Sequence, residues 1–290
     1  MKKYIYNRIK SRNIGISLIL LCVFLGAGKY TYNILHFVTT DNAQVEAHSL
    51  IISSQVTGIV QKVNITEGQH VQKDEVLVVI DDRDHRAQVD HLRNELASLV
   101  ARKLEAQRIF QRMSELFQSQ VVSRQQYESA QANLQDFRAR TEAAEAKLKQ
   151  SELNLANTII RAPTDGVIAR KSAEIGQLLS AGSPVVGFVS SEGRWVVANF
   201  KETEVSDIAI GKHVDVEIDA IPRKVFSGRV EAISAATGST FTLLPPDNAT
   251  GNFTKVVQRV PVKIQLLGLS QNEIDRIQAG LSAEVKIHIN

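Results

Sequence analysis

Residues 57–80 read TGIVQKVNITEGQHVQKDEVLVVI, and residues 165–188 read DGVIARKSAEIGQLLSAGSPVVGF. The two stretches align without a gap at a separation of 108 positions and are therefore two copies of one structural motif. Six pairs are conservative, namely Ile59/Val167, Val60/Ile168, Lys62/Arg170, Val71/Leu179, Leu77/Val185 and Ile80/Phe188. Four pairs are identical, namely Gly58/Gly166, Gly68/Gly176, Gln69/Gln177 and Val78/Val186.

Each copy has the pattern of short β-strands. Residues 59–65 alternate in side-chain character, and residues 76–80 form an apolar, mostly β-branched run that is typical of a buried strand. We interpret Gly58 and Gly68, and with them Gly166 and Gly176, as turn positions. The repeat therefore predicts one small β-sandwich whose two halves are far apart in the sequence.

The segment between the two copies has a helical pattern. Residues 82–157 contain neither glycine nor proline, and two mostly apolar seams of 29 residues each recur there at spacings of three and four. Folding the chain back near Val122 joins these seams in an antiparallel hairpin about 45 Å long, with Lys103 beside Thr141 as a polar layer. The first seam is Val89, Leu92, Leu96, Leu99, Lys103, Ala106, Phe110, Met113 and Phe117, and the second is Tyr127, Ala130, Leu134, Phe137, Thr141, Ala144, Leu148, Ser151 and Leu155.

Three acidic residues, Asp81, Asp82 and Asp84, precede the first helix. Carboxylates at this position stabilise free amide groups and the positive end of the helix dipole. A metal site is the alternative interpretation, but the spacing of His85 and His91 places those rings on different faces of a helix. We therefore favour helix capping.

The region after the second copy has the pattern of a small β-barrel or sandwich. Several short stretches alternate in polarity, and residues 202–210 are predicted to form one short helix between them. Residues 237–255 form a long loop rich in Gly, Asn, Pro and Thr. The predicted strands are residues 195–200, 213–221, 225–233, 256–267 and 283–289.

The N-terminus has the pattern of a membrane anchor. Five basic residues precede an uncharged apolar stretch at residues 13–28, and apolar residues resume at 34–38. Basic residues before such a stretch place the N-terminus in the cytoplasm and the rest of the chain on the other side of the membrane. A cleaved signal peptide is the alternative, because its basic first segment would look the same.

Composition excludes several functional classes. The chain has 34 basic and 31 acidic residues, a net charge of +3 that is too mild to indicate nucleic-acid binding. Cys22 is the only cysteine, so a disulfide framework is excluded. Phosphate-loop, nucleophile-elbow and zinc-ligand spacings are absent from the sequence. We therefore predict no catalytic activity, no cofactor and no metal site.

A split sandwich with a helical insertion resembles the membrane fusion proteins, which are periplasmic adaptor subunits of the HlyD and EmrA type. The resemblance covers essentially the whole chain. It begins with the N-terminal anchor and TTDNAQV at residues 39–45, continues through VTG at 56–58 and VLVVID at 76–81, and returns with RAPTDG at 161–166. Three stretches are similar to the EmrA-like multidrug efflux adaptors in particular. These are ANFKET at residues 198–203, LLPPDNATGNF at 243–253 and KVVQRVPV at 255–262.

The resemblance implies an α+β fold with a definite order of parts. An N-terminal transmembrane helix is followed by a split lipoyl- or biotinyl-like β-sandwich, an inserted antiparallel coiled-coil hairpin and a C-terminal β-barrel. The expected parts are a cytoplasmic tail (1–12), an anchor with its flank (13–38), the first sandwich half (39–81), the hairpin (82–157), the second sandwich half (158–190) and the barrel (191–290).

The resemblance also implies a location and partners. The chain is expected to cross the inner membrane once and to lie mostly in the periplasm, as a homo-oligomeric ring of three or six copies. It would link a major-facilitator drug:proton antiporter of the EmrB type to a TolC-like outer-membrane channel. Arg112, Leu116 and Ser123 have the spacing R-x3-L-x6-S with which adaptors of tripartite pumps contact that channel. Taken singly, they also fit a solvated helix residue, a seam flank and a turn former.

Three other functions remain open from the sequence. An adaptor of an ABC-driven (type I) secretion system would have the same architecture. A true lipoyl or biotinyl carrier would share the β-fold but would present one modifiable lysine where this chain has its helices. A purely structural coiled-coil protein would leave the barrel motifs unexplained.

Overall fold

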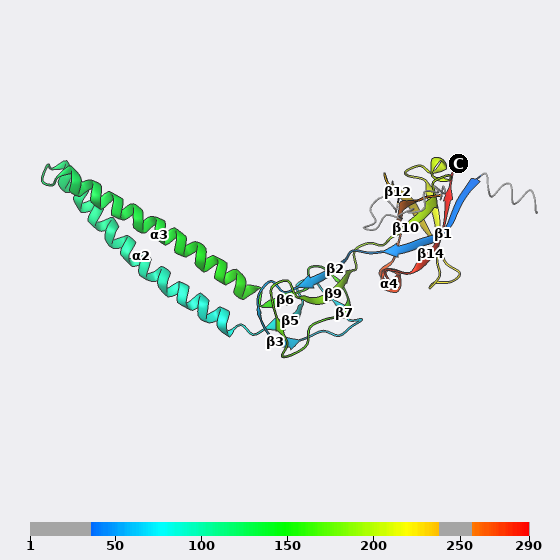
Figure 1. Ribbon diagram of the computed structural model, residues 1–290, viewed down its shortest axis with the longest axis horizontal. Helices are drawn as coiled ribbons and strands as arrows, with labels where there is room; N and C mark the ends of the chain where they lie inside the picture. Colours follow the sequence, from blue (N-terminus) through cyan, green and yellow to red (C-terminus); the bar gives the residue numbers. More distant parts are fainter. Residues whose placement is uncertain (1–35, 238–256, 290) are drawn as a thin grey trace, which may run out of the picture. The chain divides into compact units, whose positions relative to one another are not determined.

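The computed structural model describes residues 36–237 and 257–289, which form two compact units (Figure 1). One unit runs from Ser49 to Ser191, and the other joins residues 36–48 to the described residues from Glu192 onward. Each unit has its own core of buried apolar residues. This division corrects the expected start of the sandwich at residue 39, because β1 (Phe37–Glu46) is a strand of the barrel.

Two four-stranded sheets form the sandwich, and each contains strands from both halves of the repeat. Their orders are β2-β9-β7-β4 and β6-β5-β3-β8, and a shift of 108 positions converts one order into the other. Neither half therefore has a complete sheet by itself. The strands are β2 (Ser49–Ser53), β3 (Gly58–Val63), β4 (His70–Val71), β5 (Val76–Ile80), β6 (Ile159–Arg161), β7 (Gly166–Lys171), β8 (Leu178–Leu179) and β9 (Pro184–Ser190).

The identical pairs Gly68/Gly176 and Gln69/Gln177 of the repeat make equivalent contacts. The Gly68 amide donates to the Ile168 carbonyl at 2.8 Å, and the Gly176 amide donates to the Val60 carbonyl at 2.9 Å. Both glycines have a positive φ, near 80°, which glycine adopts without steric cost. The glutamine that follows each glycine accepts a backbone hydrogen bond at 3.0 Å within the same turn. The two copies thus tie each other together at matching turns.

Gly58 and Gly166 have a different role from the one predicted. They are the first residues of β3 and β7, not turn residues, and neither has a positive φ. A Cβ on Gly58 would lie 2.5 Å from the Ile80 side chain, and one on Gly166 would overlap the Phe188 ring and the Val189 carbonyl. These glycines are required because the backbone packs directly against an apolar side chain.

The helical insertion consists of α2 (Arg83–Gln118) and α3 (Arg124–Ala156), which pack against each other. The predicted helices are therefore present, with a turn at residues 119–123. Apart from Phe117, which is 37% exposed, every seam residue is buried or half-buried. At 36 residues, α2 is about 54 Å long, since an α-helix rises about 1.5 Å per residue.

The helix start differs in detail from the prediction. Asp82 occupies the N-cap position, but its side chain caps no amide and pairs instead with Arg86 at 2.6 Å. Asp81 accepts a hydrogen bond from the Arg83 amide at 3.1 Å. Hydrogen bonds from the Arg83 side chain and amide hold the pKa of the Asp81 carboxyl below its ordinary value.

The second unit is a closed six-stranded barrel in the order β1-β10-β13-β12-β11-β14. Its strands alternate buried and exposed residues, as the wall of a filled barrel requires. The predicted strands are confirmed, whereas the helix expected at residues 202–210 is only a 3-10 turn, η1 (Val205–Asp207). A short helix, α4 (Gln271–Arg276), was not predicted. The remaining strands are β10 (Trp195–Lys201), β11 (His213–Ile218), β12 (Val225–Ile233), β13 (Arg259–Leu266) and β14 (Ser282–His288).

The predicted anchor and the long loop lie almost entirely outside the described residues. Phe37 and Val38, which were expected to extend the anchor, instead begin β1 and pair with β14. Within residues 36–237 and 257–289, no helix has the length and hydropathy needed to cross a membrane. Of the loop at 237–255, only the first residue is described.

Candidate docking site at the hairpin tip

The turn between α2 and α3 is closed by backbone hydrogen bonds. The Val121 amide donates to the Leu116 carbonyl at 2.9 Å, and the Gln120 amide donates to the Phe117 carbonyl at 3.0 Å. Gln120 has a φ of 58°, in the left-handed region that lets a chain leave a helix. Val121 follows with 68% of its surface exposed, so the outermost part of the hairpin carries an apolar side chain.

Ser123 begins α3 through a capping box. Its hydroxyl accepts from the Gln126 amide at 3.3 Å, while the Gln126 side-chain carbonyl accepts from the Ser123 amide at 3.0 Å. These bonds satisfy two amides that a helix start would otherwise leave unpaired. Ser123 therefore has a structural role whether or not it also contacts a partner.

Aromatic rings join the two helices just below the turn. Phe117 stacks on Tyr127 with ring centroids 5.0 Å apart, and Phe110 lies 5.6 Å from the same ring. The contact between Phe117 and Tyr127 is the one expected from folding the chain back near Val122. The tip is therefore a packed end of the hairpin.

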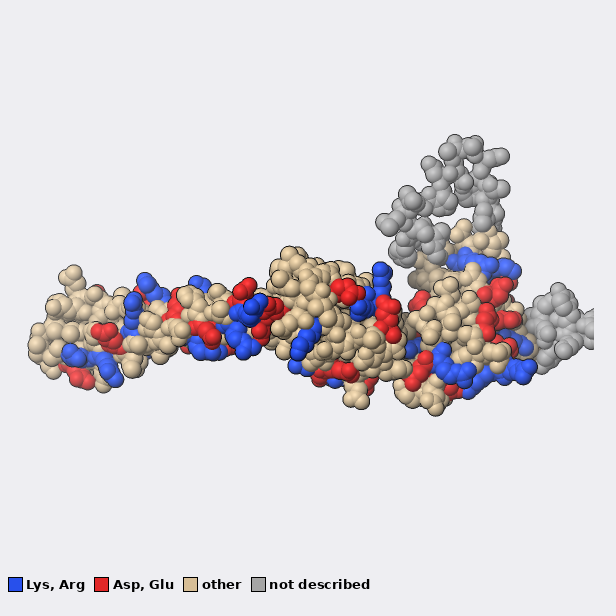
Figure 2. Space-filling view, turned by 90° about the horizontal axis from the view of Figure 1, so that it is seen from below, with Lys and Arg blue, Asp and Glu red and all other residues tan. Residues whose placement is uncertain are grey.

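An open groove of about 740 Å³ runs along the tip between the two helices. Ile109, Met113 and Ala130 give it an apolar part, and none of its lining residues is charged. In Figure 2 the outermost end of the hairpin likewise shows mainly uncharged side chains. The polar lining residues are Ser123, Gln125, Gln126, Ser129 and Asn133. Such a surface suits a partner that offers apolar contacts with hydrogen-bonding groups around them.

The three residues singled out by spacing lie in different surroundings. Arg112 is exposed on α2, and it forms no ion pair with any described residue. Leu116 is one helical turn further on and is half-buried. Only Ser123 lines the groove. Sequence reasoning did not find the groove because its lining residues come from both helices and share no motif.

Two of the carboxylates at the base of α2 are paired with arginines. Asp81 pairs with Arg83, and Asp82 pairs with Arg86, each at 2.6 Å. His85 lies 3.3 Å from the Thr57 carbonyl through its Nε2. These partners support helix stabilisation here in preference to a metal site.

Comparison with known proteins finds a matching family model for each of the two units. Residues 48–190 match the family model "RND MFP, barrel-sandwich hybrid domain", and residues 194–243 match "CusB-like, beta-barrel domain". The solved structure of the membrane fusion protein Spr0693 from Streptococcus pneumoniae R6 is 17% identical, has a TM-score of 0.62 and aligns over 87% of this chain and 97% of that one. The structural likeness shows the fold.

Two curated relatives align along nearly the whole chain. The multidrug export protein EmrA of Haemophilus influenzae is 31% identical over 98% of this chain and 85% of its own length. The colistin resistance protein EmrA of Acinetobacter baumannii is 30% identical, with 93% and 92% covered. Identity at this level over this length is evidence of common descent and not only of a common fold.

Proposed function

This chain belongs to the membrane fusion protein family, and we propose that it is the periplasmic adaptor subunit of a multidrug efflux pump. The observation that carries the proposal is the hairpin of α2 and α3, inserted between strands β5 and β6 of the sandwich. Members of this family are adaptors and not enzymes. Transport energy then comes from a partner, for which an inner-membrane major-facilitator drug:proton antiporter of the EmrB type is our proposal.

The N-terminal segment is proposed to anchor the chain in the inner membrane, with residues 1–12 in the cytoplasm and the bulk of the chain in the periplasm. The basic residues before residue 13 and the apolar run after it support this orientation. Because Phe37 already belongs to the barrel, the span must end before that residue. The anchor would keep the adaptor beside the transporter.

The hairpin tip is proposed to bind a TolC-like outer-membrane channel. Arg112 would supply a charged donor, Leu116 an apolar contact and Ser123 a hydroxyl at the groove. The exposed Val121 and the uncharged groove support docking, because a partner can cover them without leaving a charge buried and unpaired.

A ring of three or six copies is also proposed. Ile59 and Leu178 are register partners on β3 and β8, and they are 52% and 65% exposed. Adjacent exposed apolar side chains on a sheet often mark an interaction surface. This pair supports lateral packing of sandwiches in the ring.

Deleting the gene and measuring susceptibility to a panel of lipophilic toxins tests the function. The deletion strain should become sensitive, and the wild-type gene should restore resistance. The Arg112→Asp variant should be expressed and membrane-bound but should leave the strain sensitive. The matched control is Arg102→Asp, another exposed arginine of α2 without an ion pair to a described residue, which should restore resistance.

Unchanged susceptibility in the deletion strain would contradict the efflux function. If that strain instead lost a secreted protein, the ABC-driven secretion alternative would replace it. Full resistance with Arg112→Asp would contradict the role of Arg112 in docking while leaving the efflux function intact.

A further inference from the structure

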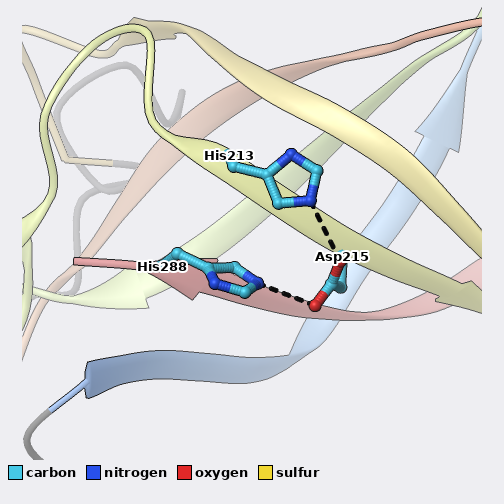
Figure 3. A group of neighbouring side chains, drawn as sticks. All are labelled: His213, Asp215 and His288. Atoms are coloured by element: carbon cyan, nitrogen blue, oxygen red, sulfur yellow. Dashed lines mark hydrogen bonds and ion pairs between the residues drawn. The ribbon is translucent and has the colours of Figure 1, made fainter. Parts of the chain in front are cut away.

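Two histidines and an aspartate meet on the outer face of the barrel (Figure 3). His213 and Asp215 are two positions apart on β11 and therefore project from the same face. His288 lies on β14, one position beyond the register pair of Val214 with Ile287, and so faces His213 across the strands. The sequence did not reveal this cluster because its members come from strands far apart in the chain.

The three side chains turn toward a common point. The Nε2 atom of His213 is 3.3 Å from one Asp215 carboxylate oxygen, and the Nε2 atom of His288 is 2.8 Å from the other. One ligand atom from each residue lies within 4.8 Å of the others. Zinc bound by nitrogen and oxygen at about 2.0–2.1 Å requires ligand atoms about 3.3 Å apart in a tetrahedron. Small side-chain rotations therefore suffice to surround one ion.

We propose that His213, Asp215 and His288 bind one divalent transition-metal ion of the zinc type. Two neutral imidazoles and one carboxylate are ligands that such ions prefer, and water can complete the coordination at this partly exposed surface. The site goes beyond the adaptor function and does not depend on it. A bound ion would connect β11 to β14, the strand between β11 and β1 in the closed barrel.

Neighbouring residues restrict the His288 ring, and the nearby positive charges of Lys286 and Arg229 repel the proposed ion only weakly. Phe37 of β1 packs edge-on against the His288 ring with centroids 4.8 Å apart, which restricts that ring's orientation. Lys286 lies opposite Asp215 in the register, but its ammonium group sits over the Phe37 ring, 3.8 Å from the centroid. Arg229 of β12 pairs with His213 in the register and is exposed, so water and salt screen its charge.

Zinc binding to the purified full-length chain, without a histidine tag and after treatment with a chelator, tests the proposal. Isothermal titration calorimetry should give one strong zinc site per chain. A thermal unfolding scan should show a higher melting temperature of the barrel with zinc than without it. The substitutions His213→Gln, Asp215→Asn and His288→Gln should each weaken zinc binding by at least about tenfold. The control His91→Gln, on the exposed face of α2, should bind zinc as the wild type does.

A second measurement on the wild-type protein does not depend on variants that fold. Zinc should shift the imidazole NMR signals of two histidines among the seven in the chain, and cobalt(II) at the same site should give a tetrahedral absorption spectrum. The proposal is overturned if zinc does not bind at one ion per chain. It is equally overturned if the three substitutions leave binding unchanged, or if the shifted signals belong to other histidines.

Discussion

Glycine serves two different purposes in the repeat, and the contacts around each residue separate them. Gly68 and Gly176 have open space where a Cβ would lie but need a positive φ. Gly58 and Gly166 have an ordinary φ, but a neighbouring side chain occupies the position of a Cβ. The same residue type is therefore required by backbone conformation in one pair and by packing in the other.

The Gly166→Ala substitution should destabilise the sandwich more than Gly68→Ala does. The added methyl group at residue 166 would overlap the Phe188 ring and a carbonyl of the paired strand, which overpacks the core and costs about 2 kcal/mol or more. At residue 68 only the left-handed conformation is penalised, by about 1 kcal/mol. Urea unfolding of both variants measures the difference, and equal losses would contradict this distinction.

At the scale of the element, the periodicity of the hairpin predicts its buried face. Leu134 is 3% exposed between the helices, whereas Leu153 on the same helix is 50% exposed. Periodicity suffices here because a helix places residues three and four apart on one face, whatever the rest of the fold does. The groove at the tip was not predictable in this way, because it depends on how two helix ends meet.

We expect Leu134→Asp to destabilise the hairpin strongly, by at least about 3 kcal/mol, since it removes a buried apolar side chain and buries a charge. Leu153→Asp adds the same charge on the solvent side, near the negative end of the helix dipole, and should cost no more than about 1 kcal/mol. Far-ultraviolet circular dichroism during urea unfolding reports helix content for both variants. Similar stabilities for the two variants would show that the assigned buried face is wrong.

At the scale of the whole molecule, the hairpin separates the proposed docking tip from the sandwich that carries it. Phe117 faces Tyr127, and Arg93 pairs with Glu152 across the helices at 3.4 Å, so the register is the same near the tip and near the base. In this register, residues 97–103 of α2 face residues 141–147 of α3. The two segments can therefore be removed together without a change of register.

Removing residues 97–103 together with 141–147 should leave a folded, membrane-bound protein that no longer confers drug resistance. The hairpin would lose about 10 Å of reach, and its tip would no longer reach the proposed outer-membrane channel. The control retains the length and replaces the same two segments by other heptads with the same apolar pattern, and it should preserve resistance. Full resistance with the shortened hairpin would contradict a role for its length.

The sequence by itself determined the repeat, the helical seams and most barrel strands. These features depend on local rules: alternation in strands, spacings of three and four in helices, and the shared turn chemistry of Gly68 and Gly176. Resemblance then identified the family. Apolar periodicity also placed the turn of the hairpin near Val122, because two seams of equal length can pair over their whole length only when the chain reverses there.

Only the tertiary structure decided which strands pair and which side chains meet. Residues 37–46 alternate as any half-buried strand does, so nothing local assigns them to the barrel instead of the sandwich. The meeting of His213, Asp215 and His288, and the overlap that requires glycine at residue 166, likewise arise between segments far apart in the chain. The physical reason is that periodicity shows which face of a strand is buried, while the choice of neighbour depends on how the complete barrel and sandwich close.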